Sequence, residues 1–248
     1  MRYFLSLAYN GTPFHGWQRQ PNASSVQETL EEALSTLLGQ PIAIMGAGRT
    51  DTGVHAKQMV THFDVDIDTE TEKNLVHMLN RYLNENIVIH SFHPVKEEAH
   101  ARFDATHRTY EYHIAFQKNP FKHNAHHILH TPPDIALMNE AANYLLQQSD
   151  FKAFSKTHTD VKTFLCDISF AHWVSTEDGA IFTITANRFL RNMVRAIVGT
   201  LLDVGTKKIA VDEINRIIES RDRGQAGFSV PACGLYLTEI NYPSEVYL

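Results

Sequence analysis

Segments that alternate between polar and apolar residues recur along this chain of 248 residues, and segments with a helical period separate them. The alternation is clearest over residues 2–9 and 108–116, which we predict to be strands. Residues 167–174 and 181–186 predict a hairpin around the Glu-Asp-Gly turn at 177–179. Because hairpins join antiparallel strands, the pattern argues against a doubly wound parallel sheet and predicts an α+β, or mixed α/β, fold.

Helices are predicted where apolar residues recur every three or four positions. Ser25 and Glu28 match a capping box ahead of such a stripe, and Gly39 is a typical end for that helix. The remaining predicted helices cover residues 72–83, 135–147, 190–204 and the region around 214–218. The remaining predicted strands cover residues 42–45, 58–65 and 235–242.

The composition is that of an ordinary globular protein, with 43% apolar and 20% charged residues. No apolar run approaches the roughly 18 residues that span a membrane, and the N-terminus is typical of a strand rather than a signal peptide. The two cysteines, Cys166 and Cys233, are far apart, which favours a cytoplasmic location and argues against structural zinc and the zinc-deaminase pattern.

Charge is distributed unevenly along a chain whose net charge is −6. Residues 188–208 hold five basic residues against one acidic residue, whereas residues 64–73 hold five acidic residues against one basic residue. A basic surface beside an acidic outer face is compatible with RNA binding. A solvated surface with mixed patches explains the same charges, so charge alone leaves both interpretations open.

The glycine-rich stretch 46–56 carries one carboxylate, Asp51, between Arg49 and His55. Glycines permit a turn that holds a side chain at a fixed angle, and a nearby arginine keeps a carboxylate ionised at neutral pH. Such a carboxylate suits a nucleophile or a general base. From the residues alone, a structural Arg–Asp pair that stiffens a loop is the more common explanation.

Residues 49–56, with the sequence RTDTGVHA, resemble the signature of the tRNA pseudouridine synthase A family, in which the Asp is the essential catalytic residue. Other segments are similar to further conserved blocks of that family, in the family's order and over nearly the whole chain: residues 9–12, 14–20, 25–28, 100–105, 108–112, 189–199 and 234–237. The resemblance implies a central, mostly antiparallel sheet in two similar halves flanked by helices, with the active cleft between them. The halves would be residues 1–116 and 135–248, joined by residues 117–134.

By this resemblance, the chain isomerises uridine to pseudouridine around positions 38–40 of the tRNA anticodon stem-loop, as a homodimer and without cofactor or metal. The target base must be flipped out of the stack before it can react. The implied catalytic residues are Asp51, Arg195, which sits beside the Asp in the family, and Tyr110, which lies over the base. Leu235 matches a position that packs near the base. Four arginines are candidates for phosphate contacts: Arg49, Arg102, Arg108 and Arg191.

Several alternatives stay open at this stage. Asp51 can start the reaction at C6 of the base, at C1′ or at C2′. Trp17, Gln18 and Arg19 either line the cleft or only pack it. Ser149, Lys162 and Cys233 depart from the family's patterns, and none of them belongs to the implied catalytic trio.

Two rival functions remain. One is a metal-dependent phosphoesterase or nuclease that uses the acidic run and the histidines at 123, 126, 127 and 130, which share one face if the segment is helical. The other is a catalytically inactive RNA-binding member of the same fold. His55, inside the signature, is a better candidate for local hydrogen bonding than for base catalysis.

Overall fold

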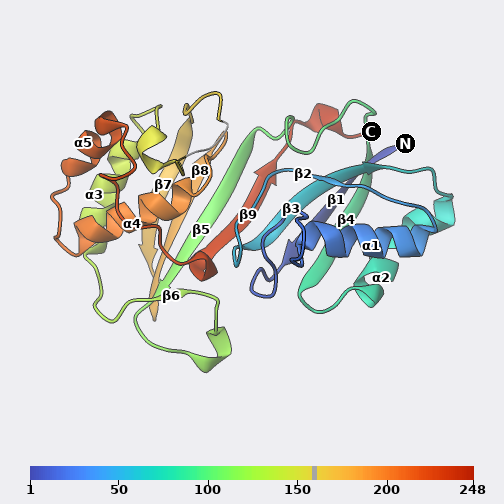
Figure 1. Cartoon of the computed structure of the whole chain (residues 1–248), viewed down its shortest axis with the longest axis horizontal. Helices are drawn as coiled ribbons and strands as arrows, with labels where there is room; N and C mark the ends of the chain where they lie inside the picture. The colour runs from blue at the N-terminus through green and yellow to red at the C-terminus, as the bar shows by residue number, and fades with distance from the viewer. Residues whose placement is uncertain (158–160) are drawn as a thin grey trace. The chain divides into compact units, whose positions relative to one another are not determined.

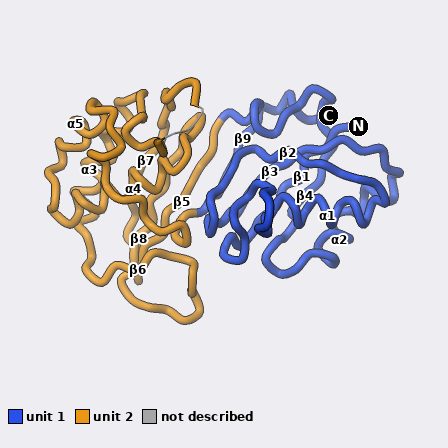
Figure 2. Tube along the Cα trace, in the orientation of Figure 1, with its two compact units in different colours: residues 1–106, 236–248 blue, residues 107–235 orange. Residues whose placement is uncertain are grey.

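The computed structural model describes residues 1–157 and 161–248, and within that part the chain forms nine strands and five α-helices. The chain divides into two compact units: the first is Met1–Thr106 with Tyr236–Leu248, and the second is His107–Leu235 (Figure 2). Mixed strand pairing with helices in both units confirms the predicted α+β class. No helix in the described part is both long and apolar enough to cross a membrane.

The first unit is built on β1 (Arg2–Tyr9), which lies between β3 (His55–Asp64) and β4 (Ile87–Val95) and is antiparallel to both. The strand order is β4-β1-β3-β9, in which β9 (Leu235–Asn241) is parallel to β3. The short β2 (Met45–Gly46) pairs with β3. Helix α2 (Thr69–Tyr82) packs against β4 and against α1 (Val26–Leu38) (Figure 1).

The second unit is built on the antiparallel order β5-β8-β7, with β5 (His107–Ala115), β8 (Gly179–Ala186) and β7 (Ile168–Ser175). The short β6 (His127–Ile128) is parallel to β5. Helix α3 (Ile135–Leu145) packs against β7 and α4 (Met193–Gly205), and α5 (Glu213–Ser220) lies next to α3. Four short 3₁₀ helices complete the elements: Pro120–Lys122, Lys152–Phe154, Ala232–Gly234 and Ser244–Val246.

The best-defined predictions are confirmed, with the strands of the hairpin within two residues of the predicted 167–174 and 181–186. Strand β1 covers residues 2–9 as predicted, and the β7–β8 hairpin turns at residues 176–178. Helix α1 begins after Ser25, whose side chain accepts a hydrogen bond from the Glu28 N–H, and ends before Gly39 at φ 67°. Local chemistry was sufficient in these cases, because caps and turns depend on residues only a few positions apart.

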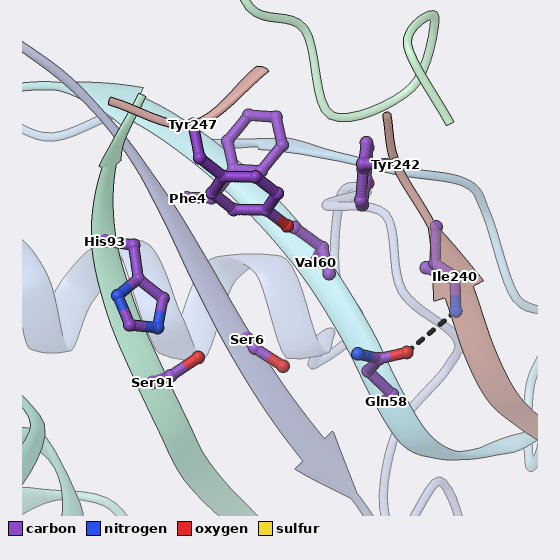
Figure 3. Close-up of a pocket in the computed structure, with 9 residues that line it drawn as sticks. All are labelled: Phe4, Ser6, Gln58, Val60, Ser91, His93, Ile240, Tyr242 and Tyr247. Atoms are coloured by element: carbon purple, nitrogen blue, oxygen red, sulfur yellow. Dashed lines mark hydrogen bonds between the residues drawn. The ribbon is translucent and has the colours of Figure 1, made fainter. Parts of the chain in front are cut away.

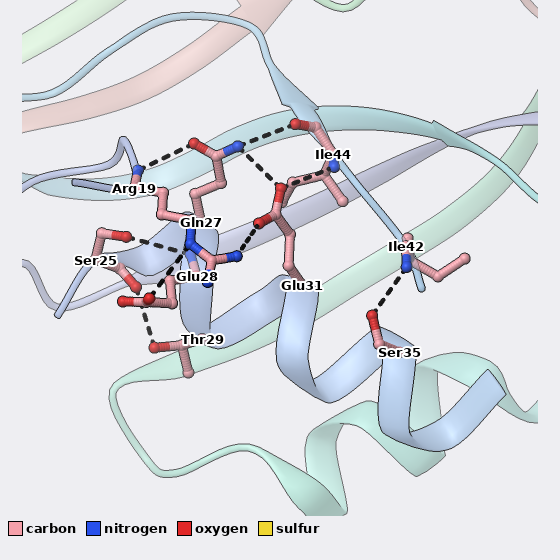
Figure 4. Close-up of polar contacts among 9 residues, drawn as sticks. All are labelled: Arg19, Ser25, Gln27, Glu28, Thr29, Glu31, Ser35, Ile42 and Ile44. Atoms are coloured by element: carbon pink, nitrogen blue, oxygen red, sulfur yellow. Dashed lines mark hydrogen bonds and ion pairs between the residues drawn. The ribbon is translucent and has the colours of Figure 1, made fainter. Parts of the chain in front are cut away.

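Several predictions were wrong in part, and one strand was missed. Strand β3 and helix α2 each begin three residues before the predicted ranges 58–65 and 72–83. Of the strand expected over residues 42–45, only Met45 is in β2, because Ile42 and Ile44 donate their N–H groups to the side chains of Ser35 and Glu31 (Figure 4). Helix α4 begins at Met193 rather than at residue 190, because Asn192 has φ 67°. Strand β4 was missed because it contains Pro94, which an edge strand tolerates.

The two compact units have boundaries that differ from the predicted halves, 1–116 and 135–248. Strand β5 and residues 117–134 belong to the second unit, whereas almost all of β9 belongs to the first. The first unit therefore takes its last strand from the end of the chain. The two-half organisation implied by the family resemblance stays a prediction.

Candidate active site

The turn that carries Asp51 lies between β2 and β3 in the first unit. The Val54 N–H donates to the Asp51 carbonyl at 3.1 Å, and Gly53 has φ 77°, in the left-handed region that favours glycine. Asp51 is half-buried and Thr50, just before it, is buried. The turn therefore has a defined backbone and presents the carboxylate at a partly accessible position.

Residues 9–17 hold this turn from the N-terminal side. The Tyr9 hydroxyl lies 2.9 Å from the Thr50 hydroxyl, and the Trp17 N–H donates to the Thr50 carbonyl at 3.2 Å. Gly16 has φ 98°, and a Cβ there would lie 2.6 Å from the same carbonyl. The N-terminal motif thus holds Thr50, the residue before Asp51, and these contacts leave no room for a side chain at position 16.

His55 closes the other side of the turn. Its Nδ1 accepts a hydrogen bond from the Gly11 N–H at 3.1 Å, and its ring stacks on Tyr236 with centroids 4.6 Å apart. His55 therefore makes the local hydrogen bond that its sequence position suggested. Tyr236 was missed as a supporting residue, and its only signal was its place in the C-terminal motif at residues 234–237.

Trp17 and Arg19 have packing roles in the structure. Trp17 is 3% exposed and lies against Gly46, where a Cβ would come within 2.5 Å of the indole Nε1. Arg19 forms ion pairs of 3.4 Å with Glu28 and Glu31 on α1 (Figure 4). Both side chains therefore stabilise the N-terminal segment that holds the Asp51 turn.

Tyr110 lies on β5 in the second unit, opposite Ile184 of β8. It is half-buried, and its ring meets Phe189 edge-on at 5.2 Å. Tyr112, two positions along on the same face, is fully buried and donates its hydroxyl to the Pro231 carbonyl at 2.9 Å. Burial raises the pKa of Tyr112. The two tyrosines therefore differ in accessibility, and Tyr110 is the one that a ligand can reach.

Arg195 lies on α4 and is fastened to an extended segment that runs beside the helix. Its Nε donates to the Val230 carbonyl at 2.6 Å, and the Val230 N–H donates back to the Arg195 carbonyl at 3.3 Å. Gly199 allows the close approach, since a Cβ there would lie 1.8 Å from the Phe228 carbonyl oxygen. The sequence did not predict the role of Val230, because any residue type has a backbone carbonyl.

The remaining predicted site residues are divided between the units. Arg49 and Arg102 are exposed and belong to the first unit with Asp51. In the second unit, Arg191 is exposed, whereas the half-buried Arg108 donates to the Asn187 carbonyl at 2.9 Å. Leu235 is buried at the start of β9. The exposed arginines are therefore the more accessible candidates for phosphate contacts.

The histidines at 123–130 do not lie along a helix. The segment consists of loop and β6, and burial lowers the pKa of His127 there. The acidic run beyond residue 63 serves structural roles: Asp64 forms two 2.8 Å bonds to Arg2, and Asp68 caps α2. Within residues 1–157 and 161–248, no three His, Cys, Asp or Glu side chains form a group that could hold a metal ion.

A hollow of about 300 Å³ lies on one face of the first unit's sheet (Figure 3). It is lined by alternate residues of β1 and β3, including Phe4, Ser6 and Gln58, and by Tyr242 and Tyr247 near the C-terminus. None of the residues predicted to act in catalysis or RNA binding lines it. We therefore place the candidate site at the Asp51 turn and not at this hollow.

Comparison with known proteins gives a consistent result. The chain matches the family model described as tRNA pseudouridine synthase over residues 6–104 and 141–243, which include Asp51 and Arg195 but not Tyr110. It is 52% identical over 250 residues to the tRNA pseudouridine synthase A of Porphyromonas gingivalis, a match covering 100% of this chain and 99% of that protein. The proteins of the same name from Bacteroides fragilis and Acetivibrio thermocellus are 50% identical (99% of this chain, 98% of that one) and 40% identical (96% and 98%).

Proposed function

We propose that this chain, which belongs to the tRNA pseudouridine synthase family and isomerises uridine in tRNA, acts on uridines around positions 38–40 of the anticodon stem-loop. The observation that carries the proposal is the Asp51 turn, whose backbone is fixed on both sides by residues 9–17 and His55. A catalytic group must be held close to its productive geometry, and this turn has the necessary restraint.

The reaction breaks the N1–C1′ bond, rotates the uracil and rejoins it to the ribose through C5. No atom is gained or lost, so the protein has to supply positioning and proton transfer, after the target nucleotide has been flipped out of its stack. Asp51 acts as nucleophile or base, and attack at C6, attack at C1′ and proton abstraction at C2′ remain three routes for it.

The other catalytic residues act around Asp51 in this proposal. Arg195 keeps the Asp51 carboxylate ionised and oriented, as a neighbouring cation does. Tyr110 stacks on the uracil and assists removal of the C5 proton, which fits its partly accessible ring. Leu235 packs near the base.

RNA binding in this proposal depends on phosphate contacts from Arg49, Arg102, Arg108 and Arg191. The protein acts as a homodimer in the cytoplasm and uses neither cofactor nor metal. The basic segment 188–208, in a chain of net charge −6, supports an RNA contact on the surface that includes Arg191.

The test is to incubate the protein with an unmodified tRNA transcript in monovalent salt and EDTA, and then to map pseudouridines at single-nucleotide resolution. We expect pseudouridine at one or more of positions 38–40, and none in a control transcript in which these uridines are replaced by cytidine. Modification elsewhere would contradict the proposed positions. In a parallel incubation with Mg²⁺ in place of EDTA, RNA cleavage would support the phosphoesterase. Binding without product in either buffer would support the inactive RNA-binding protein.

A further inference from the structure

A ladder of rings runs from the core of the first unit to its surface. The buried His62 on β3 meets His100 with ring centroids 4.6 Å apart, and His100 meets Phe103 at 4.3 Å. The guanidinium of Arg102 lies 5.7 Å from the centroid of the Phe103 ring. Phe103 is 74% exposed, so the outer end of the ladder is open to solvent.

Hydrogen bonds hold the inner part of the loop at residues 100–105, which we call the ladder loop. The Ala101 N–H donates to Nδ1 of His62 at 3.1 Å, and the Ala101 carbonyl accepts from the Tyr242 hydroxyl at 2.6 Å. Burial, with smaller contributions from His100 and Arg2, lowers the pKa of His62 to about 4. His62 is therefore neutral at physiological pH, and its Nδ1 remains an acceptor.

The outer part of the ladder loop is fixed as well. Nδ1 of His100 accepts from the N–H groups of Arg102 at 3.1 Å and Phe103 at 3.4 Å. The Asp104 carboxylate accepts from the His100 N–H at 2.7 Å, and the Asp104 N–H donates to the His100 carbonyl at 3.1 Å. An exposed aromatic ring on a loop held this firmly loses little conformational entropy when it binds a partner.

We propose that Phe103 is a stacking platform for an unpaired base of the substrate RNA, with Arg102 beside it to contact phosphate and with His62 and His100 as positioning residues. Every base offers a π-face, and an exposed ring next to an arginine is the combination that binds unpaired nucleotides. The inference rests on the proposed function, because it assigns the same tRNA as the ligand.

The platform is separate from the chemistry at Asp51. His62, which holds the ladder loop, is seven residues along β3 from His55, which closes the Asp51 turn, so the two lie roughly 23 Å apart along the strand. Because Phe103 belongs to the ladder loop and not to the Asp51 turn, we assign it a nucleotide other than the target. Loss of Phe103 is therefore expected to weaken tRNA binding without slowing the chemical step.

The test compares Phe103→Ala, Phe103→Leu and Phe103→Trp by direct binding to unmodified tRNA and by single-turnover pseudouridine formation at saturating protein. We expect the Kd of Phe103→Ala to rise about 5- to 150-fold, the range expected for one base–aromatic stack. Phe103→Leu should resemble Phe103→Ala and Phe103→Trp should resemble the wild type, with the single-turnover rate unchanged in all three. The Kd for a blunt RNA duplex without unpaired bases should not depend on residue 103.

The matched control is Tyr82→Ala, which removes another exposed ring of the first unit, at the end of α2, and should leave the Kd unchanged. Positioning is tested with His62→Phe, which removes the acceptor for the Ala101 N–H, and with His62→Asn, whose side-chain oxygen can replace Nδ1. We expect the Kd to rise in His62→Phe and to recover in His62→Asn. If His62→Phe does not fold, the surface variants at position 103 still decide the question.

If Phe103→Ala binds tRNA with the wild-type Kd, the inference is overturned. The same holds if Phe103→Ala no longer sediments as a dimer and its Kd per folded chain is unchanged. Neither result affects the proposed function, which is tested by where the wild-type protein places pseudouridine. Conversely, if the wild type modifies tRNA outside positions 38–40, the Kd comparison still reports on the stacking platform.

Discussion

The Asp51 turn in the first unit and the Arg195 side chain in the second are both restrained, but through different contacts. The turn is held by backbone contacts to the Thr50 carbonyl. The Trp17 N–H donates to this carbonyl, and Gly16 lies so close to it that a side chain would not fit. Arg195 lies on helix α4, and its Nε donates a hydrogen bond to the carbonyl of Val230. Both restraints come from segments distant in sequence: Tyr9 lies 41 residues from Thr50, and Val230 lies 35 residues from Arg195.

The comparison implies that side-chain chemistry and backbone support can be separated at the turn. Asp51→Asn changes only the side chain, so the backbone contacts of Thr50 and Val54 remain. If the carboxylate is the nucleophile or base, we expect pseudouridine formation to fall by about 10³-fold or more. The melting temperature and the tRNA affinity should stay near those of the wild type.

All three quantities should be measured on the same Asp51→Asn sample. A purely structural Arg–Asp pair would behave differently, since breaking it lowers the melting temperature and reduces activity only through loss of folded protein. Substantial turnover by well-folded Asp51→Asn protein would falsify the catalytic assignment of this carboxylate.

Gly16→Ala changes the support and leaves Asp51 intact. The new Cβ would lie 2.6 Å from the Thr50 carbonyl at a residue with φ 98°, so the turn must shift. A displacement of about 1 Å at a catalytic group can cost about 10²-fold in rate, and we expect a loss of that order together with about 1–3 kcal/mol of stability.

Gly39→Ala is the matched control for Gly16→Ala. Gly39 also has positive φ, at 67°, but a Cβ there meets nothing within 4 Å. It should cost about 1–2 kcal/mol of stability and leave the rate per folded molecule unchanged. Equal rate losses in the two variants would show that the close contact of Gly16 with the Thr50 carbonyl has no special importance for catalysis.

The sequence separation of the interacting groups explains what the sequence could predict. Ser25 and Gly39 cap α1, and alternation marks β1 and the β7–β8 hairpin, because these signals are local. The Ile44 N–H donates to the Glu31 side chain instead of pairing with a neighbouring strand. This contact could not be predicted, since it depends on where α1 lies in the fold. Strand β4 was missed because it contains Pro94.

The candidate site follows the same rule. Asp51 and the residues that grip it were visible as motifs, whereas His55 could be given only a general hydrogen-bonding role and Tyr236 none. The ladder loop was visible as residues 100–105, but its support by His62 was not, because His62 lies 39 residues from its hydrogen-bond partner. Motifs therefore identify reactive groups more readily than the groups that position them.

The smallest expected effect concerns the second unit. Arg195→Lys keeps the positive charge but loses the planar Nε donor to the Val230 carbonyl. Hydrogen bonds to charged groups contribute about 1.5–3 kcal/mol, so we expect a stability loss of that order and a fall in kcat of about tenfold with little change in KM. Charge alone would then be insufficient, and the direction of the guanidinium would matter.

Arg223→Lys separates catalysis from packing, because Arg223 fastens the same segment by donating to Ala226, Gly227 and Ser229. It should lower the stability to a similar extent without the fall in kcat. If both variants lose kcat equally, the segment at 226–230 matters only as a whole, and Arg195 has no distinct role. If only Arg195→Lys loses kcat, the contact with the Val230 carbonyl directs the cation, as the Thr50 contacts direct the carboxylate in the first unit.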